Sequence, residues 1–511
     1  MLVLALIIYS LSSVAAGTTV KGTPAPARYY RDQIVDHDSC CDNRRWTQRY
    51  YTWGKEFQGP GYPIFCIMGG EGNIEPETGL FYPFVTHHLA KDFGAYVLEP
   101  EHRFYGESQP VAITTDNDPR ELLFTPKQAL QDAMRLIRHH QEKLGCSLNR
   151  TSPDYCPVIT VGGSYPGWLS AMARLQFPDV VDMAYAASAP MKFYSQQVDA
   201  GAYYELITRV AEKSIPGCSE QVKITLGMVD FISRELPDSD VENMAQAFGF
   251  CPGTKPDYIQ TMRMLAQEVF MIVGYTFAND NMANYPPTNQ TRLYQACETF
   301  SSINNLDPVQ RVGQFLIQHL AGDNSHCVDM SSQLPTGHDA TISAGDWSGV
   351  GTGSSGESWD WQTCSLLIEK IGFSSKSMFP ERNWTMGWMT EHCQKRFNVT
   401  PQAFELVKEW HFDDLVGSTN ASHILFTNGL NDGWSVGGIL EDLSDTLITI
   451  NFENGAHHSD LSGQGPSDRD TPDIKHGFVS IRNILMDWLN GIQPGRYPLL
   501  SSLRQSAVAK N

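Results

Sequence analysis

The sequence predicts an α/β fold in which a mainly parallel β-sheet carries one large, mostly helical insertion. Short apolar runs alternate with amphipathic segments over about residues 45–190, a pattern typical of consecutive βαβ units. From about residue 190 to 420 the pattern changes to long helical stretches and Gly/Ser-rich loops. Strand-like runs return only at residues 424–427 and 447–450, so we expect the middle of the chain to form a cap over the sheet.

Composition is compatible with such a fold and narrows the classes of partner. The chain has 511 residues, of which 41% are apolar and 18% charged, as expected for one large globular domain with an insertion or for two domains. The formal net charge is -20, which would repel both nucleic acid and an anionic membrane surface. We therefore expect neither nucleic-acid binding nor membrane-surface binding.

The N-terminus resembles a secretory signal peptide. A short apolar run, residues 2–11, is followed by small residues ending in Val14-Ala15-Ala16, which predicts a signal peptide over residues 1–16. The run is too short to span a bilayer, and no later stretch approaches 20 apolar residues, so no membrane span is expected. The predicted location is the exterior or a lysosomal or vacuolar compartment. Glycosylation sequons begin at Asn149, Asn289, Asn383, Asn398 and Asn420.

Eleven cysteines in a secreted chain predict several disulfides and at least one free thiol. Cys146 and Cys156 bracket a polar loop and form a natural local pair. Cys66 lies within the apolar run 63–68, which we interpret as a buried strand, and it is the first candidate for the free thiol.

The elements of the sheet can be followed along the chain. Runs 63–68 and 95–98 are strand-like, and Thr125-Pro126-Lys127-Gln128 is the start signal of a helix with a capping box. Apolar residues at helical spacing predict that this helix packs on the sheet before the next strand, 158–161. A last helix is expected at about 474–489.

The strand 158–161 runs into Gly162-Gly163-Ser164-Tyr165-Pro166, which predicts a sharp strand-to-helix turn that presents the Ser164 hydroxyl as a nucleophile. Pro166 is expected to hold Tyr165 out of the helical region and to delay the helix start. The backbone N–H of Tyr165 can still serve an oxyanion. The Gly-rich loop after strand 63–68 is expected to provide a second donor from Gly70 or Glu71.

A carboxylate and a histidine follow the two strands near the C-terminus. Asp432 comes after strand 424–427 and a turn of Asn and Gly, and His457 and His458 come after strand 447–452. The order Ser, Asp, His is that of the α/β-hydrolase fold, in which each member of the triad follows a different strand. The residues themselves do not choose between His457 and His458. The expected organisation is a hydrolase domain in two parts, 17–190 and 421–511, with the helical cap at 191–420.

At this point the chain resembles a known family, the serine peptidases that include lysosomal prolyl carboxypeptidase, dipeptidyl peptidase II and thymus-specific serine protease. The likeness covers nearly the whole mature chain. It rests on the Gly-rich loop 69–73, Glu101-His102-Arg103-Phe104-Tyr105-Gly106-Glu107-Ser108, the Gly-Gly-Ser-Tyr turn, Ala187-Ser188-Ala189-Pro190, Trp361-Gln362-Thr363-Cys364, and residues 428–435 and 455–458.

The resemblance implies a catalytic triad of Ser164, Asp432 and His457, because the family uses the first histidine of its pair. It implies hydrolysis of the bond after proline, near one end of a short peptide, through an acyl-enzyme. The expected partners are therefore short proline-containing peptides, with a homodimer left open. By the family's cysteine order it also implies disulfides between Cys218 and Cys297, Cys251 and Cys327, and Cys364 and Cys393.

Two departures limit this transfer. The family's turn often reads Gly-Gly-Ser-Tyr-Gly-Gly, whereas Pro166 stands here. Many relatives carry Thr-Glu after the cysteine of the Trp-Gln-Cys segment, whereas Ser365-Leu366 follow Cys364. A charge at the substrate end of the cleft is thus missing, and carboxypeptidase and dipeptidyl peptidase activity both remain open.

The sequence also allows other interpretations of the site and of the function. Trp359 and Trp361 are candidates for the wall of a proline pocket, although packing is the more common role of such aromatics. No zinc-binding, P-loop or other cofactor motif is present, so no cofactor and no metal are implied. Two other functions remain: an esterase or lipase on the same fold, and a non-catalytic binding protein on a hydrolase scaffold.

Overall fold

The fold is an eight-stranded sheet with helices on both faces and a helical insertion. The computed structural model describes residues 22–113, 118–302, 306–322, 325–335, 347, 355–418, 420–463 and 465–497. The predicted signal peptide, residues 1–16, lies outside them. The strand order is β1-β2-β4-β3-β5-β6-β7-β8, and the sheet is parallel from β4 to β8. The predicted α/β-hydrolase class with a helical insert is confirmed.

The two N-terminal strands form an antiparallel edge on the parallel part of the sheet. The strands are β1 (Arg28–Ile34), β2 (Arg45–Trp53), β3 (Ile64–Ile67), β4 (Tyr96–Pro100), β5 (Val158–Gly163), β6 (Met183–Ala187), β7 (Ile424–Gly429) and β8 (Leu447–Phe452). Each predicted strand corresponds to one of these. β3, β5, β6 and β7 are buried along their whole length, as expected for central strands covered on both faces.

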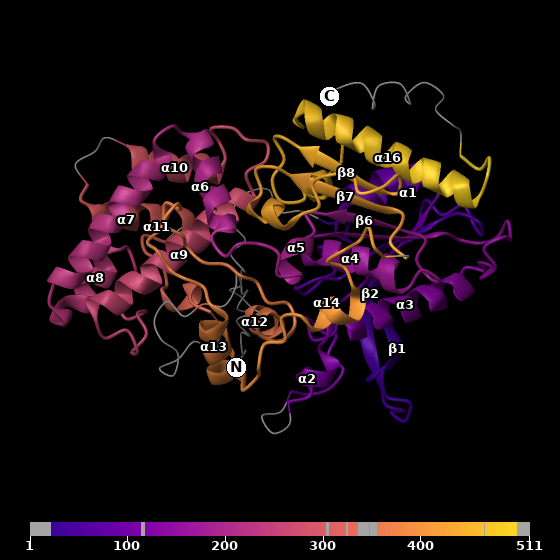
Figure 1. The fold of residues 1–511 in the computed structure, drawn as a ribbon, viewed down its shortest axis with the longest axis horizontal. Helices are drawn as coiled ribbons and strands as arrows, with labels where there is room; N and C mark the ends of the chain where they lie inside the picture. The colour runs from indigo at the N-terminus through magenta and orange to yellow at the C-terminus, as the bar shows by residue number, and fades with distance from the viewer. Residues whose placement is uncertain are drawn as a thin grey trace, which may run out of the picture.

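Alternate residues of the central strands enter two separate hydrophobic cores. On one face Phe65 and Val161 pack with η1 (Phe84–Leu89), α1 (Ala90–Phe93) and α16 (Pro472–Ile492). On the other face Cys66 and Ala186 pack with α3 (Pro126–Lys143) and α4 (Tyr165–Gln176). Figure 1 shows α16 and α3 on opposite sides of the sheet. The second core continues into the insertion, so cap and sheet share one apolar interior.

The predicted start of α3 is half right. The Thr125 hydroxyl accepts a hydrogen bond from the Gln128 backbone N–H, as an N-cap should. The Gln128 side chain does not complete a capping box. Its amide instead donates to Asp36 at 2.8 Å, and its oxygen accepts from the buried Arg103 at 3.2 Å. The buried guanidinium needs acceptors, and it recruits the side chain that would otherwise have capped the helix.

The insertion between β6 and β7 is built mainly from helices, which Figure 1 shows gathered beside the sheet. Helices α6, α7, α9, α10 and α11 pack on one another and contribute to the apolar interior shared with the sheet. The helical elements of the insertion are α5 (Met191–Tyr194), α6 (Ala202–Ser214), α7 (Cys218–Glu235), η2 (Asp238–Asp240), α8 (Val241–Ala247), α9 (Met262–Met282), α10 (Arg292–Ser301), α11 (Pro308–Leu320), η3 (Ser331–Gln333), α12 (Gly356–Ser365), α13 (Met386–Phe397) and α14 (Glu405–Trp410). Outside it lie α2 (Arg120–Leu123), η4 (Gly433–Gly437) and α15 (Ser459–Ser462).

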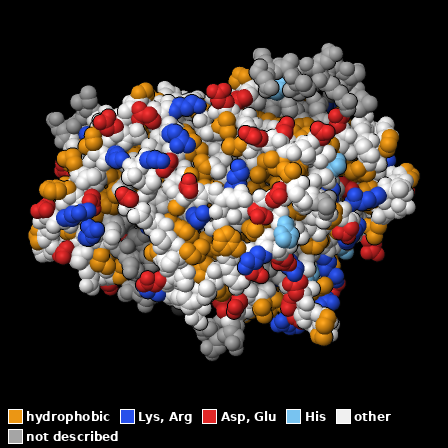
Figure 2. Space-filling view, in the orientation of Figure 1, with side chains coloured by type: hydrophobic (Ala, Val, Ile, Leu, Met, Phe, Trp, Pro, Cys, Tyr) orange, Lys and Arg blue, Asp and Glu red, His pale blue; other side chains and the backbone are white. Residues whose placement is uncertain are grey.

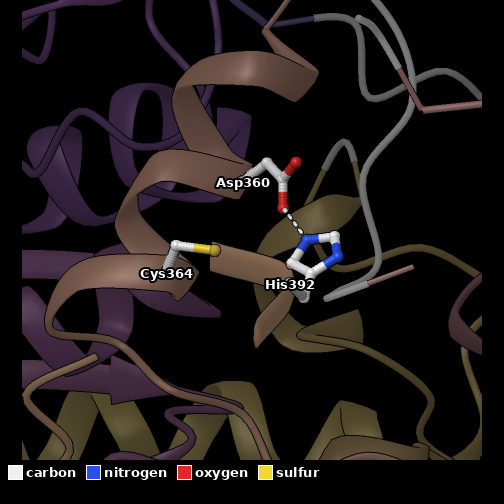
Figure 3. A group of neighbouring side chains, drawn as sticks. All are labelled: Asp360, Cys364 and His392. Atoms are coloured by element: carbon white, nitrogen blue, oxygen red, sulfur yellow. Dashed lines mark ion pairs between the residues drawn. The ribbon is translucent and has the colours of Figure 1, made fainter. Parts of the chain in front are cut away.

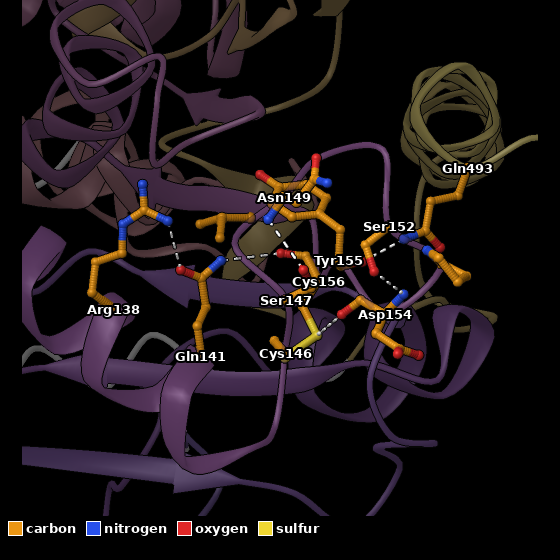
Figure 4. Close-up of a disulfide and its surroundings, with 12 residues drawn as sticks. Arg138, Gln141, Cys146, Ser147, Asn149, Ser152, Asp154, Tyr155, Cys156 and Gln493 are labelled. Atoms are coloured by element: carbon orange, nitrogen blue, oxygen red, sulfur yellow. Dashed lines mark hydrogen bonds between the residues drawn. A yellow bond between two sulfur atoms is a disulfide. The ribbon is translucent and has the colours of Figure 1, made fainter.

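Four disulfides hold the structure. Cys146–Cys156 closes the polar loop before β5, with Asn149 on that loop (Figure 4). The three pairs implied by the resemblance are present in the insertion: Cys218–Cys297, Cys251–Cys327 and Cys364–Cys393. Cys66 is a buried free thiol, as expected, and Cys40 and Cys41 are exposed free thiols.

The surface carries charges of both signs and exposes the asparagines of the predicted sequons. Acidic and basic side chains are interspersed over the face seen in Figure 2 rather than gathered by sign. All five sequon asparagines, Asn149, Asn289, Asn383, Asn398 and Asn420, are exposed. Among the described residues, no helix has both the length and the apolar character needed to cross a bilayer.

Candidate active site

Ser164 lies in a strained turn between β5 and α4. Its backbone has φ 64° and ψ -135°, a conformation that L residues rarely adopt, and its N–H donates to the Ala187 carbonyl at 2.9 Å. A Cβ at Gly162 would lie 2.2 Å from the Pro166 carbonyl oxygen, so this position requires glycine. The sharp strand-to-helix turn that the sequence predicts at Ser164 is therefore present.

The predicted delay of the helix by Pro166 is wrong, because α4 begins at Tyr165. The first helical hydrogen bond runs from the Trp168 N–H to the Ser164 carbonyl at 3.1 Å and does not involve the missing N–H of Pro166. The preference of a residue before proline for extended backbone is outweighed here by the close packing of the turn.

Asp432 and His457 form a buried pair. Asp432 follows β7 and is 0% exposed, and its Oδ2 lies 2.7 Å from His457 Nδ1. Its Oδ1 accepts the Trp434 backbone N–H at 3.1 Å. Because a carboxylate only accepts hydrogen bonds, Nδ1 must carry a proton, and in the neutral ring Nε2 is then the nitrogen with the free lone pair. This tautomer is the one that a general base requires.

His458 occupies a different environment from His457. Its backbone N–H donates to the Ser188 hydroxyl at 2.9 Å, and its ring centroid lies 6.0 Å from that of Tyr82. Burial, followed by the neighbouring His457, holds the pKa of His458 well below its usual range. Of the two adjacent histidines, His457 is thus the one whose ring contacts the carboxylate.

Ser164 and His457 line the same cavity, whose volume is about 440 Å³. The cavity lies at the carboxyl ends of the parallel strands, where open α/β sheets place their sites. Gly70 and Glu71, in the loop after β3, also line it. Among the described residues that line it, there is no lysine and no arginine.

The loop that carries Gly70 and Glu71 is held in place by Glu101, the first residue of the Glu-His-Arg motif. Glu101 is fully buried and accepts the Ile74 backbone N–H at 3.0 Å. It also forms an ion pair of 2.6 Å with Arg49, whose guanidinium contacts Asn73 at the end of the loop. Two buried ionic groups therefore fix the position of the candidate oxyanion donors.

The second residue of the motif supports Tyr165 from the other side. His102 Nδ1 lies 2.7 Å from the Arg103 carbonyl and must donate to it, so Nε2 accepts the Tyr165 hydroxyl at 3.0 Å. Burial lowers the pKa of His102 to about 4, which keeps the ring neutral. The Gln362 amide also donates to the Tyr165 hydroxyl, at 3.2 Å. Two motifs far apart in the sequence thus meet at the residue after Ser164.

The two tryptophans proposed for the proline pocket lie in different places. Trp359 lines the cavity, with its ring centroid 5.4 Å from that of Tyr165. Trp361 points into another apolar cluster, where the Arg120 guanidinium lies 4.3 Å from its ring centroid. Trp361 therefore packs and does not line the cavity.

Sequence reasoning missed a carboxyl in the cavity. Glu369 lines it although the residue is only 2% exposed, and neither of its oxygens forms a hydrogen bond of regular geometry among the described residues. Burial first, and then the Glu71 carboxyl, raise the pKa of Glu369 to about 8, against the opposite effect of the Tyr194 hydroxyl. Burial likewise raises the pKa of Glu71. An acid directly after Leu366-Leu367-Ile368 was the available signal.

The insertion also contains a second cavity and a cluster of potential metal ligands. A cavity of about 480 Å³ between α7, α9 and α13 is lined by charges of both signs. Beside it, Asp360, Cys364 and His392 come together (Figure 3), with 3.7 Å between His392 Nε2 and the Asp360 carboxylate. Cys364 is bonded to Cys393 and offers no thiolate, and Asp360 also pairs with Arg396. The group therefore does not fit a thiolate metal site.

Comparison with known proteins adds the family. The family described as "Serine carboxypeptidase S28" matches residues 33–477. The chain is 28% identical over 494 residues to Lysosomal Pro-X carboxypeptidase of Mus musculus, with 92% of each chain covered. It is 26% identical to the Thymus-specific serine protease of Mus musculus, over 92% of this chain and 88% of that one. Among solved structures, Pyrococcus horikoshii acylaminoacyl peptidase is similar with a TM-score of 0.31 and 9% identity, over 92% of this chain and 42% of that one.

Proposed function

Because the chain belongs to the serine carboxypeptidase S28 family, we propose that it is a serine exopeptidase that cleaves peptide bonds after proline, near one end of short peptides. The observation that carries this proposal is the 2.7 Å contact of His457 with the buried Asp432, in the same cavity as Ser164. A hydroxyl, an imidazole held at Nδ1 and a buried carboxylate are the three groups that a Ser-His-Asp mechanism requires, and this supports the proposal.

Acylation uses these three groups in turn. As Ser164 Oγ attacks the carbonyl carbon, His457 Nε2 takes the hydroxyl proton, and Asp432 stabilises the imidazolium that forms. The tetrahedral intermediate collapses when the imidazolium gives that proton to the leaving amine, which breaks the C–N bond and leaves an ester on Ser164. Water then attacks the ester carbonyl while His457 takes its proton, and the acid product leaves as Ser164 regains its hydroxyl proton from His457.

The oxyanion of the intermediate needs donors that are already in place. We assign this role to the backbone N–H groups of Tyr165 and of Gly70 or Glu71. The support is indirect: the Tyr165 side chain and the loop after β3 are each held by buried partners. Fixed donors are effective because they do not have to reorganise as the charge develops.

Aromatic and apolar groups give the cavity a surface suited to a proline ring. Trp359, Trp434, Tyr194 and Met282 all line it. A proline ring brings apolar surface and no N–H, so a pocket of this kind requires no additional acceptor. We therefore propose Trp359 as one wall of the proline pocket.

The proposed location is the exterior or a lysosomal compartment, with the enzyme glycosylated. Four disulfides favour an oxidising route of synthesis, and the five sequon asparagines are exposed. Relatives named lysosomal fit the same route. Endoglycosidase treatment should lower the mass of the purified protein. A homodimer stays a prediction, to be tested by sedimentation.

The proposal is tested by substituting the nucleophile. Ser164→Ala should abolish release of product from prolyl peptides while leaving thermal unfolding unchanged. The control is Ser233→Ala on α7, where the hydroxyl donates only to the Asp230 carbonyl. If Ser164→Ala keeps full turnover, the mechanism is wrong. If wild type hydrolyses simple acyl esters and no prolyl peptide, the esterase alternative replaces it.

A further inference from the structure

We propose that Glu369 binds a positively charged group of the substrate, so that the cavity selects peptides that carry an ammonium or guanidinium group on the acyl side of the scissile bond. This inference rests on the proposed peptidase function and names the end of the peptide that the site recognises.

The first argument is the state of the Glu369 side chain. It is 2% exposed and faces the cavity of Ser164 and His457, yet neither carboxyl oxygen forms a hydrogen bond of regular geometry among the described residues, and the uncharged Tyr194 hydroxyl is the one donor that acts on it. Buried carboxyl groups are normally paired, because an unpaired one loses its hydration without compensation. A side chain that faces a binding cavity in this condition can obtain its partner from the ligand.

The second argument is the absence of a compensating cation nearby. No lysine or arginine lines the described part of the cavity, and the ammonium of the adjacent Lys370 donates to the Gln196 carbonyl at 2.7 Å. The ionisable groups that interact with Glu369 are Glu71, Tyr194 and Tyr203. None of these is a cation, and one of them is a second acid.

The third argument is discrimination between the two ends of a peptide. Once Glu71 and Glu369 are ionised they would repel a C-terminal carboxylate, and no lysine or arginine among the described lining residues could receive it. An ammonium would instead meet two acids. The charge of the site therefore favours a dipeptidyl peptidase over a carboxypeptidase. The cation can be the substrate's own α-ammonium or a basic side chain beside proline.

Binding of a cation should also release a proton. Since the pKa of Glu369 is about 8 in the empty site, the group is protonated under acidic conditions and must lose its proton to form the ion pair. The KM for a cationic substrate should thus fall as the pH rises toward 8. The pH optimum of kcat/KM should lie higher for that substrate than for its acetylated counterpart.

The experiment uses four fluorogenic substrates with the same uncharged coumarin leaving group: Ala-Pro, acetyl-Ala-Pro, Lys-Pro and acetyl-Lys-Pro. In wild type, we expect kcat/KM for Ala-Pro to exceed that for acetyl-Ala-Pro by about 30-fold or more, the range for a buried charge that loses its partner. Glu369→Gln should reduce this preference to less than about threefold. The control is Glu99→Gln, which removes a buried acid outside the cavity and should leave the preference intact.

The four substrates distinguish an α-ammonium from a basic side chain as the cation that Glu369 binds. Cleavage of Ala-Pro over acetyl-Ala-Pro identifies the α-ammonium, and rescue of acetyl-Lys-Pro identifies the side chain. Either preference, lost in Glu369→Gln, supports the proposal. If all four substrates are cleaved with equal kcat/KM, the proposal is overturned while the peptidase function stands. Faster cleavage of acetyl-Ala-Pro-Phe than of its amide would also overturn the proposal, because it indicates recognition of a C-terminal carboxylate. If no substrate is cleaved, the peptidase function fails. In that case, calorimetry that compares the affinities of Ala-Pro-amide and acetyl-Ala-Pro-amide still tests whether Glu369 binds the cation. Equal affinities would refute that binding.

Discussion

The burial of Glu369 has a measurable effect on stability as well as on binding. The pKa of this carboxyl rises from an ordinary value of 4.5 to about 8 in the folded protein, so the folded state binds the proton more tightly than the unfolded state. This raised pKa costs no stability below pH 4.5. The cost grows as the pH rises from 4.5 to 8 and is then constant. At 1.36 kcal/mol per pKa unit, the full cost is about 3 to 5 kcal/mol.

Glu369→Gln should remove this cost and therefore stabilise the protein only at higher pH. With an unfolding entropy of about 2.1 cal/mol/K per residue, a chain of this length gains about 3 to 5 °C in melting temperature at pH 8.5 and almost nothing at pH 4. Differential scanning calorimetry at both pH values measures the difference. The control is Glu235→Gln on the exposed surface of α7. If the melting temperatures of wild type and Glu369→Gln differ by the same amount at both pH values, the reasoning is refuted.

Three further predictions concern the site and the core. Asp432→Asn should lower kcat about 10⁴-fold without disturbing the fold, because an amide can donate to His457 Nδ1 and favour the wrong tautomer. A less than tenfold loss of kcat in a quenched steady-state assay would contradict this. Glu101→Gln should lower stability by about 3 to 5 kcal/mol, because Arg49 then loses its one buried anion and keeps only the exposed Glu75 and Glu107; an unchanged midpoint of unfolding in urea would contradict it. Cys66 should resist iodoacetamide in the native protein, because burial raises the pKa of its thiol; peptide mapping that finds it labelled as fast as Cys40 would contradict it.

Much of the scaffold could be predicted because its signals are local. Runs of apolar residues mark the buried strands, and their periodicity distinguishes β5 from α3. The turn at Ser164 could be predicted because only glycine fits so close to the next helix. Even there, local preference failed in one respect: Pro166 did not delay α4, because tertiary packing decides where that helix begins.

The substrate end of the site could not be predicted, because it depends on contacts between distant segments. Glu369 belongs to no motif, and its significance comes from lying in a cavity with Glu71, almost 300 positions earlier in the chain. Likewise, only the folded structure brings His102 and Gln362 to the Tyr165 hydroxyl and separates Trp359 from its neighbour in the cap.

The central claim is that peptide bonds after proline are broken through an ester on Ser164. The most direct test is intact-mass spectrometry of the enzyme, quenched in acid within milliseconds of mixing with Ala-Pro-coumarin amide and followed by peptide mapping. We predict a transient mass increase equal to one Ala-Pro acyl group, located on the peptide that contains Ser164 and absent from Ser164→Ala. Product release without any such adduct, together with retained turnover in Ser164→Ala, would contradict the account.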